Sequence, residues 1–296
     1  MKAIVLLNQT AGTLATVADQ NGDELVAAAM SKAGIDAEIR VLPGDQLRAA
    51  AEEAVKRPVD VVVVGGGDGT LSTVAGVLVD TPMPLGVLPL GTLNHFAKDL
   101  GIPGDLEGAV RVIAAGNVRP VDVGSVNDRV FINNSSLGLY PMMVRNREAH
   151  QSRNGSNKWF AMIVAMAKVF RRFPLVNVRL TTDETQVVRK TPLVFVGNNC
   201  YQLDLFNIGS RACLDAGELS LYVANAQTRW GIVKLTFRAM LGMLEQSRDF
   251  ETFCLSNCLI ETHKKQLHVA VDGEVIKLKT PLQYRVRAAA LRVCLP

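Results

Sequence analysis

A glycine-rich loop near the start of the chain could bind phosphate. Gly65–Thr70 contains four glycines within five positions and one carboxylate, Asp68, and it directly follows the four valines Val61–Val64. Glycine lets a ligand approach the backbone closely, and the free N–H groups where a helix begins favour phosphate. This run exceeds what a plain tight turn between a strand and a helix needs. We therefore predict a phosphate-binding loop, with the plain turn as the alternative.

This loop does not match the two commonest nucleotide-binding glycine motifs. It lacks the Gly-Lys-Ser/Thr of a P-loop, and Ser72 stands where the dinucleotide fingerprint has its third glycine. A carboxylate beside phosphates repels them unless a metal or a proton lies between. Because Mg²⁺ binds phosphate oxygens with the help of one or two carboxylates, Asp68 is predicted to act through magnesium.

A second loop follows the next strand-like run. In Pro89–Ala97, Gly91 could offer a backbone N–H and Thr92 a hydroxyl to a nucleotide, and Asn94 either joins them or simply caps the following helix. Both loops fall at the carboxyl ends of predicted strands, which is where open α/β sheets bind ligands. The two loops are therefore expected to lie together.

Two carboxylates near the end of the chain have a spacing suited to acid–base chemistry. Asp272 and Glu274 flank Gly273 after the alternating run Leu267–Val271. In an extended chain, residues two apart point to the same face, and a carboxylate can accept a proton from a hydroxyl. The alternative is an Asp-Gly hairpin turn with Glu274 merely solvated, and the residues alone favour it.

The surrounding pattern predicts two kinds of structure. Over residues 1–120, short β-branched runs alternate with helical patterns, which predicts a doubly wound α/β domain with a parallel sheet. From there strand-like runs dominate, which predicts a β-sandwich domain over 121–296 whose last strand could return to the first domain. Two helical stretches, near 157–172 and 228–246, interrupt the second domain.

Composition limits the function further. The chain has 296 residues, 48% hydrophobic residues and a net charge of +4, too small to indicate nucleic acid but suited to weak attraction to an anionic membrane. Five cysteines without a C-x-x-C pair indicate neither a disulfide scaffold nor a zinc site. The first residues lack a signal-peptide pattern, and no run approaches the roughly 18 apolar residues of a membrane span. We expect a cytoplasmic protein in peripheral contact with the inner face of a membrane.

The two loops together resemble a known family. GGGDGTL at 65–71, followed by LPLGTLNHFAKDLGIP at 88–103, is similar to the diacylglycerol kinase catalytic-domain family, which includes bacterial lipid kinases and sphingosine kinases. The first motif alone would also fit NAD kinases and phosphofructokinases, and the second favours the lipid kinases. Three further segments, 7–12, 131–138 and 271–274, also match the family, so the resemblance covers nearly the whole chain.

The resemblance implies an ATP-dependent lipid kinase that requires Mg²⁺ and phosphorylates a hydroxyl of a lipid such as diacylglycerol, as in phospholipid biosynthesis. It implies three catalytic carboxylates, whose roles stay open among them: Glu274 or Asp272 as the base, and Asp68 at the Mg-ATP. The nucleotide-binding residues implied are Asn8, Gly12, Gly65, Gly66, Gly67, Asp68, Gly69, Thr70, Gly91, Thr92 and Asn94.

The chain departs from the family pattern at several positions. Gln9 and Ala11 replace the proline and serine of the first loop, and His95 stands where the family often has an aspartate. Ala216 interrupts the D-G-x-L segment that binds a structural Mg²⁺ in bacterial members, which leaves Asp215 as the candidate metal ligand. These changes keep two alternatives open, a kinase for a soluble substrate related to NAD kinases and an inactive relative that binds nucleotide or lipid.

Two apolar, basic segments are candidates for lipid contact. They are 158–173 and Trp230–Arg238, and ordinary core helices explain them equally well. A lipid substrate and an anionic membrane are the expected partners, nucleic acid is not, and assembly into a homodimer is left open.

Overall fold

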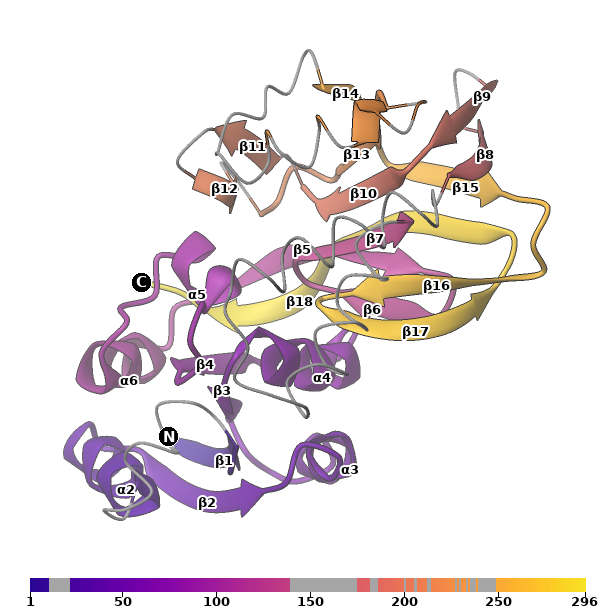
Figure 1. Cartoon of the computed structure of the whole chain (residues 1–296). Helices are drawn as coiled ribbons and strands as arrows, with labels where there is room; N and C mark the ends of the chain where they lie inside the picture. The colour runs from indigo at the N-terminus through magenta and orange to yellow at the C-terminus, as the bar shows by residue number, and fades with distance from the viewer. Residues whose placement is uncertain are drawn as a thin grey trace, which may run out of the picture. The chain divides into compact units, whose positions relative to one another are not determined.

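The computed structural model folds into two compact units (Figure 1). The first unit comprises Met1–Val123, Cys213–Gly217 and Arg287–Pro296, and the second comprises Gly124–Ala212 and Glu218–Val286. The structure describes residues 1–10, 22–138, 175–181, 186–199, 201–204, 207–211, 214–226, 228, 230–232, 234, 238 and 249–296.

The first unit is built on a parallel sheet in the order β2-β1-β3-β4, to which the end of β18 is added beside β4. The strands are β1 (Lys2–Asn8), β2 (Asp36–Leu42), β3 (Val61–Gly66), β4 (Leu85–Pro89) and β18 (Leu282–Cys294). The helices are α2 (Gly22–Lys32), α3 (Leu47–Ala54), α4 (Asp68–Leu78), α5 (His95–Asp99) and α6 (Leu106–Ala115).

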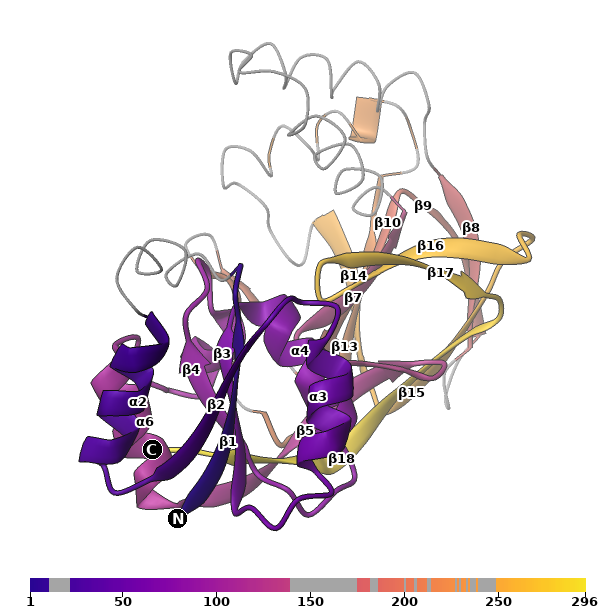
Figure 2. The ribbon, with the colours of Figure 1, turned by 90° about the horizontal axis from the view of Figure 1, so that it is seen from below.

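Helices cover both faces of this sheet. Figure 2 shows α2 and α6 on one face and α3 and α4 on the other. Because both faces are covered, the valines of β3 are at most 1% exposed, as the unbroken valine run predicts. Each crossover helix begins close to the carboxyl end of a strand, so the loops before α4 and α5 lie at the same edge of the sheet. The prediction of a doubly wound α/β domain is confirmed.

The second unit is an antiparallel sandwich. One sheet has the order β14-β13-β10-β7-β16-β17, and β5, β6, β8, β9 and β15 form the opposing layer with the first part of β18. β11 and β12 form a separate two-stranded sheet. The first sheet comprises β7 (Asn134–Gly138), β10 (Leu193–Asn198), β13 (Leu219–Ala224), β14 (Phe250–Leu255), β16 (Gln266–Val271) and β17 (Glu274–Lys279). The remaining strands are β5 (Val118–Val126), β6 (Arg129–Phe131), β8 (Val176–Thr181), β9 (Gln186–Thr191), β11 (Tyr201–Asp204), β12 (Asn207–Arg211) and β15 (Asn257–Glu261).

Side chains from both layers of the second unit form one core. Val196 and Leu221 come from the six-stranded sheet, and Ile260 and Tyr284 come from the opposing layer. The buried hydroxyl of Tyr284 lies 3.0 Å from Ser135 Oγ, so this polar group is satisfied inside the apolar layer. The prediction of a β-sandwich in the second half of the chain is also confirmed.

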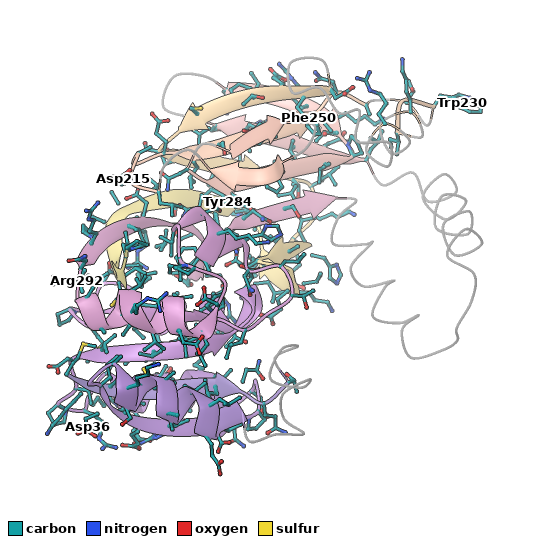
Figure 3. The ribbon with its side chains drawn as sticks, turned by 90° about the vertical axis from the view of Figure 1, so that its left-hand side faces the viewer. Asp36, Asp215, Trp230, Phe250, Tyr284 and Arg292 are labelled. Carbon is teal, nitrogen blue, oxygen red and sulfur yellow. The ribbon has the colours of Figure 1, made fainter. Side chains whose placement is uncertain are left out.

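Part of the predicted helical sequence lies outside the described residues. This applies to the whole stretch 157–172 and to much of 228–246. Within the second stretch, Trp230 is 74% exposed, and Figure 3 shows its indole reaching away from the ribbon. No helix in the described part of the chain is both long enough and apolar enough to cross a membrane.

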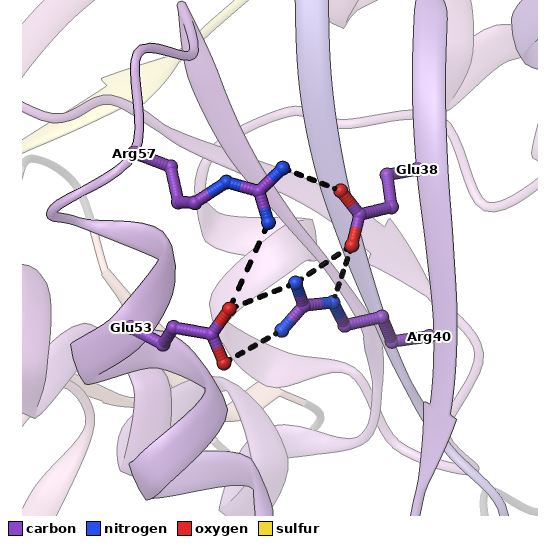
Figure 4. Close-up of polar contacts among 4 residues, drawn as sticks. All are labelled: Glu38, Arg40, Glu53 and Arg57. Carbon is purple, nitrogen blue, oxygen red and sulfur yellow. Dashed lines mark hydrogen bonds and ion pairs between the residues drawn. The ribbon is translucent and has the colours of Figure 1, made fainter.

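An ion-pair network covers the edge strand of the first unit (Figure 4). Arg40 on β2 donates two hydrogen bonds of 3.0 Å to the carboxylate of Glu53 on α3 and one of 2.7 Å to Glu38. Arg57 adds a 3.0 Å bond to Glu38. The hydrogen bonds from Arg40 hold the pKa of Glu38 and of Glu53 below the ordinary value of 4.5. Charged side chains on an edge strand also oppose pairing with another chain.

The network predicts a pH-dependent effect of Arg40→Gln. Because the folded-state pKa values of Glu38 and Glu53 are lowered, the stabilisation is present above pH 4.5 and is lost as pH falls through those folded-state values. Urea unfolding should therefore show a lower midpoint for the variant at neutral pH, and a difference from the parent that shrinks as the pH falls below 4.5 through the lowered values. Arg111→Gln, at an exposed arginine outside the network, should change neither midpoint. A difference that persists in acid would contradict this interpretation.

Candidate functional site

A cavity of about 390 Å³ opens at the carboxyl ends of the strands of the first unit. It collects residues from the ends of β1, β3 and β4 and from the start of α3. Its lining residues are Asn8, Thr10, Gly44, Leu47, Gly67, Gly69, Thr70, Thr73, Gly91 and Thr92. Six of these were predicted to bind nucleotide: Asn8, Gly67, Gly69, Thr70, Gly91 and Thr92. Gly12 lies outside the described residues.

The two glycine loops meet backbone to backbone. A Cβ on Gly91 would collide with the Cα of Gly67, so the loops can approach this closely only because neither carries a side chain there. Gly65 and Gly66 belong to β3, and a Cβ on either would collide with Leu7 or with Thr70. The glycines of this run therefore have different roles, and those two are needed for packing beneath the cavity.

Gly69 differs from its neighbours. It lies in the first turn of α4 and lines the cavity, and its φ is not positive. A Cβ there would meet no atom of the described residues within 4 Å. Glycine within a helix costs about 1 kcal/mol relative to alanine, and nothing in the packing of the described residues requires it here. The N–H groups of Gly69 and Thr70 also fall among the first-turn donors that have no partner within a helix. This turn can therefore receive an anion at close range.

Asp68 joins the two loops. Its carboxylate accepts hydrogen bonds from the backbone N–H of His95 at 3.1 Å and of Phe96 at 3.0 Å, both in the first turn of α5. Asp68 is the first residue of α4 and does not line the cavity. The structure thus shows Asp68 as an anchor for the second loop. Its role at Mg-ATP stays a prediction, which these bonds leave room for because each carboxylate oxygen has a second lone pair.

Two asparagines order the loops around the cavity. Asn8 donates to Thr70 Oγ1 at 2.8 Å and accepts from the backbone N–H and the hydroxyl of Thr10. Asn94, with φ of 51°, accepts from Gly91 N at 2.9 Å and donates to the carbonyls of Pro89 and Gly91. The N–H of Gly91 is therefore already donated within its own loop. Asn94 holds the loop in shape rather than lining the cavity.

The second unit places Asp272 and Glu274 in different environments. Asp272 and Gly273 form a two-residue turn with φ of 45° and 89° between β16 and β17, so the Asp-Gly hairpin is what the structure contains. The assumption that the two carboxylates share a face of an extended strand is wrong, because Asp272 is not in a strand. Its carboxylate accepts from the backbone N–H groups of Ile132, Asn133 and Asn134 at 2.8 to 2.9 Å.

Glu274 is the accessible member of the pair. It begins β17 opposite Val271, and its side chain is exposed. Within the described residues, its carboxylate takes part in no hydrogen bond or ion pair. Asp272 fixes the β6–β7 connection to the hairpin, whereas the carboxylate of Glu274 stays exposed beside the turn.

Comparisons with known proteins agree with this geometry. Residues 2–126 match the family model described as the diacylglycerol kinase catalytic domain, and residues 140–295 match that of the YegS C-terminal NAD kinase beta sandwich-like domain. The chain belongs to the diacylglycerol kinase catalytic-domain family.

Individual members of this kinase family match parts of the chain. The chain is 44% identical over 111 residues to a probable lipid kinase YegS-like protein of Klebsiella pneumoniae (strain 342). This match covers 36% of the chain and 37% of that protein. The chain is 30% identical over 175 residues to a diacylglycerol kinase of Staphylococcus aureus (strain JH9), covering 58% and 55%. The matches thus span only about a third to a half of these relatives.

The fold as a whole matches solved structures. A crystal structure of a diacylglycerol kinase from Bacillus anthracis str. Sterne aligns with a TM-score of 0.68 at 23% identity, covering 100% of this chain and 97% of that one. A second structure from the same organism aligns with a TM-score of 0.71 at 24% identity, with the same coverage. At such low identity these structures bear on the fold alone.

The departure at His95 from the family pattern leaves the loop anchor intact. His95 reaches Asp68 through its backbone N–H, which any residue other than proline provides at that position. The altered side chain therefore does not disturb the contact between the two loops.

A buried carboxylate on β5, Asp122, contacts the segment around Asp215, and the sequence analysis missed it. Asp122, 3% exposed, accepts from Gly217 N at 2.7 Å and from Ala289 N at 2.8 Å. It thereby connects β5 to the 214–217 segment and to the end of β18 within the first unit. The only sequence signal was an acidic residue inside an apolar strand-like run, Val121–Val126. Asp215 itself is exposed (Figure 3).

The metal role of Asp215 stays a prediction. Nowhere in the described part of the chain do three or more histidine, cysteine, aspartate or glutamate side chains gather as metal ligands. A cation bound there would depend largely on backbone carbonyls and water.

Proposed function

We propose that this protein is an ATP-dependent lipid kinase that transfers the γ-phosphate of Mg-ATP to a hydroxyl of a lipid such as diacylglycerol. The observation that carries the proposal is Gly69. It is a glycine that neither the packing of the described residues nor its backbone conformation requires, and it lies in the first turn of a helix at the wall of a cavity that the two joined loops border. Room for a close anion explains it.

The cavity residues suit the phosphates of ATP. The first-turn N–H groups of Gly69 and Thr70 would bind phosphate oxygens, helped by the positive end of the α4 dipole. Thr10, Thr73 and Thr92 add hydroxyls to the same wall. Since no lysine or arginine among the described residues lines the cavity, the phosphate charge must be balanced in another way.

The oxygen donors around the cavity fit a magnesium ion. Asp68 supplies a carboxylate at the joined loops, and threonine hydroxyls supply neutral oxygens. Mg²⁺ prefers such ligands and usually takes only one or two carboxylates together with substrate phosphates. Bound there, Mg²⁺ would neutralise the charge that develops on the transferred phosphate. In this proposal Asp68 holds the second loop in place and contributes to Mg-ATP binding.

Glu274 is proposed as the general base. It accepts the proton of the lipid hydroxyl as the hydroxyl oxygen bonds to the γ-phosphorus. The bond between the γ-phosphorus and the oxygen that bridges the β- and γ-phosphates then breaks, which releases ADP. Asp272 is less suited, because three backbone N–H groups already occupy its carboxylate. Its part in this proposal is to hold the turn that presents Glu274.

A lipid acceptor also implies where in the cell the protein acts. We propose that the protein acts at the cytoplasmic face of a membrane through peripheral contact, as the small positive charge favours. Whether it works as a homodimer is a separate prediction that size measurements in solution would test.

Incubation of the full chain with γ-labelled ATP, Mg²⁺ and mixed lipids tests the proposal. The expected result is a labelled product that partitions into chloroform, and omission of Mg²⁺ should abolish it. A parallel reaction offers NAD as the acceptor. Labelled NADP without any labelled lipid would replace the lipid acceptor by a soluble one, and clear ATP binding without turnover on any acceptor would indicate an inactive relative.

A further inference from the structure

A second cavity, of about 630 Å³, lies in the second unit and is strongly basic. Three of its seven lining residues are lysines, one is a histidine, and none is acidic. We call it the lysine cavity, and its lining residues are Thr262, His263, Lys264, Lys265, Gln266, Lys279 and Thr280. The loop from β15 to β16 and the end of β17, from which the chain continues to β18, contribute these residues (Figure 1).

Hydrogen bonds between the two loops give the lysine cavity a fixed backbone. Thr280 donates from its hydroxyl to the carbonyl of Lys264 at 2.5 Å and from its N–H to the carbonyl of Lys265 at 3.1 Å. The N–H of Lys264 donates to Thr262 Oγ1 at 3.2 Å. These bonds occupy two carbonyl oxygens that would otherwise repel an anion. The lysine side chains therefore extend from backbone segments that hydrogen bonds hold in place.

The positive charges of the lysine cavity are not neutralised from within the described structure. Lys264, Lys265 and Lys279 are exposed, and none of them has a described carboxylate within 4.0 Å. The neighbouring Glu261 pairs with Arg179 instead, at 3.7 Å. A cleft lined by one sign of charge concentrates ions of the opposite sign. Several lysines that converge from two loops are suited to a phosphate group, which accepts many hydrogen bonds.

The lysine cavity is separate from the proposed base. Glu274 and Lys279 are the first and last residues of β17, and Gln266 pairs with Lys279 at the open end of the same hairpin. At roughly 3.4 Å per residue, the two ends of β17 are roughly 17 Å apart. A phosphate held by Lys279 is therefore not the one that reacts beside Glu274.

We propose that the lysine cavity is a second anion site, which binds a phosphate-bearing ligand that is not the reacting phosphate. The shared chemistry is a phosphate group with at least one negative charge. This phosphate group could come from two sources, the head group of an anionic phospholipid such as phosphatidic acid or a soluble phosphate ion. Binding of the first kind would hold the second unit against a membrane, and binding of the second kind would make the cavity a sensor of free phosphate.

Charge-matched variants of the full chain test this proposal in two arms. The cavity variant is Lys264→Gln/Lys265→Gln/Lys279→Gln, and the control Lys32→Gln/Lys56→Gln/Lys190→Gln removes the same charge at exposed lysines elsewhere. One arm measures co-sedimentation with phosphatidylcholine vesicles that contain or lack phosphatidic acid. The other measures binding of inorganic phosphate by titration calorimetry. Thermal unfolding of each variant checks the fold, and the single change Lys279→Gln is measured alongside.

The expected result is a fall of roughly tenfold or more in affinity for the cavity variant and a near-parental affinity for the control. The loss should appear with phosphatidic acid vesicles alone if the ligand is a lipid head group, and with inorganic phosphate if it is a free ion. Equal binding by the cavity variant and the control in both arms would overturn the proposal. So would a parent chain that binds neither probe. Neither outcome bears on whether lipid is phosphorylated.

Discussion

The Glu274→Gln variant is expected to lose about 10²–10⁴-fold in kcat, while its stability and its affinity for ATP stay close to those of the parent chain. Glutamine keeps the size of the side chain but cannot accept the hydroxyl proton. Since Glu274 is exposed and its carboxylate makes no hydrogen bond or ion pair with described residues, its loss should leave the hairpin intact. Steady-state kinetics with γ-labelled ATP and diacylglycerol vesicles, together with thermal unfolding, measure both effects.

Two comparison variants make the result for Glu274 specific. Glu107→Gln makes the same change at an exposed glutamate on α6 and should leave kcat unchanged. Asp272→Ala should instead lower the stability by about 1–3 kcal/mol or more, because three backbone N–H groups lose their acceptor. Near-parental kcat in Glu274→Gln would remove Glu274 from the mechanism.

The Gly69→Ala variant is expected to bind ATP at least about tenfold more weakly while it unfolds at the same or a higher temperature. A methyl group there enters the cavity where a phosphate would approach the first turn of α4, but it meets no atom of the described residues within 4 Å. Replacing glycine by alanine at an unstrained helical position stabilises a protein by about 0.4–1 kcal/mol. Titration calorimetry with Mg-ATP and thermal unfolding separate the two effects.

Other glycines of the first unit provide the controls. A Cβ on Gly104 also meets no described atom within 4 Å, and Gly104 is not among the cavity's lining residues, so Gly104→Ala should leave ATP affinity unchanged. Gly91→Ala should lower both affinity and stability, because its methyl group would collide with the Gly67 backbone. If Gly69→Ala binds ATP as the parent does, the first turn of α4 is not where phosphate binds.

The features that depend on local sequence pattern were predictable. The valine run of β3 and the alternation of strand and helix in the first 120 residues determine a parallel sheet with helices on both faces. Because the carboxyl ends of such strands share one edge, the meeting of the two glycine loops followed from the fold class. The close approach of the Gly67 and Gly91 backbones agrees with that expectation.

The features that depend on tertiary pairing were not predictable. From the sequence, Asp68 was predicted only as a carboxylate at Mg-ATP. Its hydrogen bonds to the start of α5 could not be predicted, because they depend on how two separate loops are placed relative to each other. The residues alone favoured an Asp-Gly turn at Asp272, but the three N–H groups around the β6–β7 connection that its carboxylate accepts were not predictable. The lysine cavity shows no pattern in the sequence, since only the pairing of Gln266 with Lys279 brings its two loops together.

A crystal structure of the chain with Mg²⁺ and a non-hydrolysable ATP analogue tests the central claim most directly. We expect the phosphates at the N–H groups of Gly69 and Thr70, in the cavity bounded by the loops that Asp68 joins. A nucleotide bound elsewhere, with this cavity holding only water, would contradict the account.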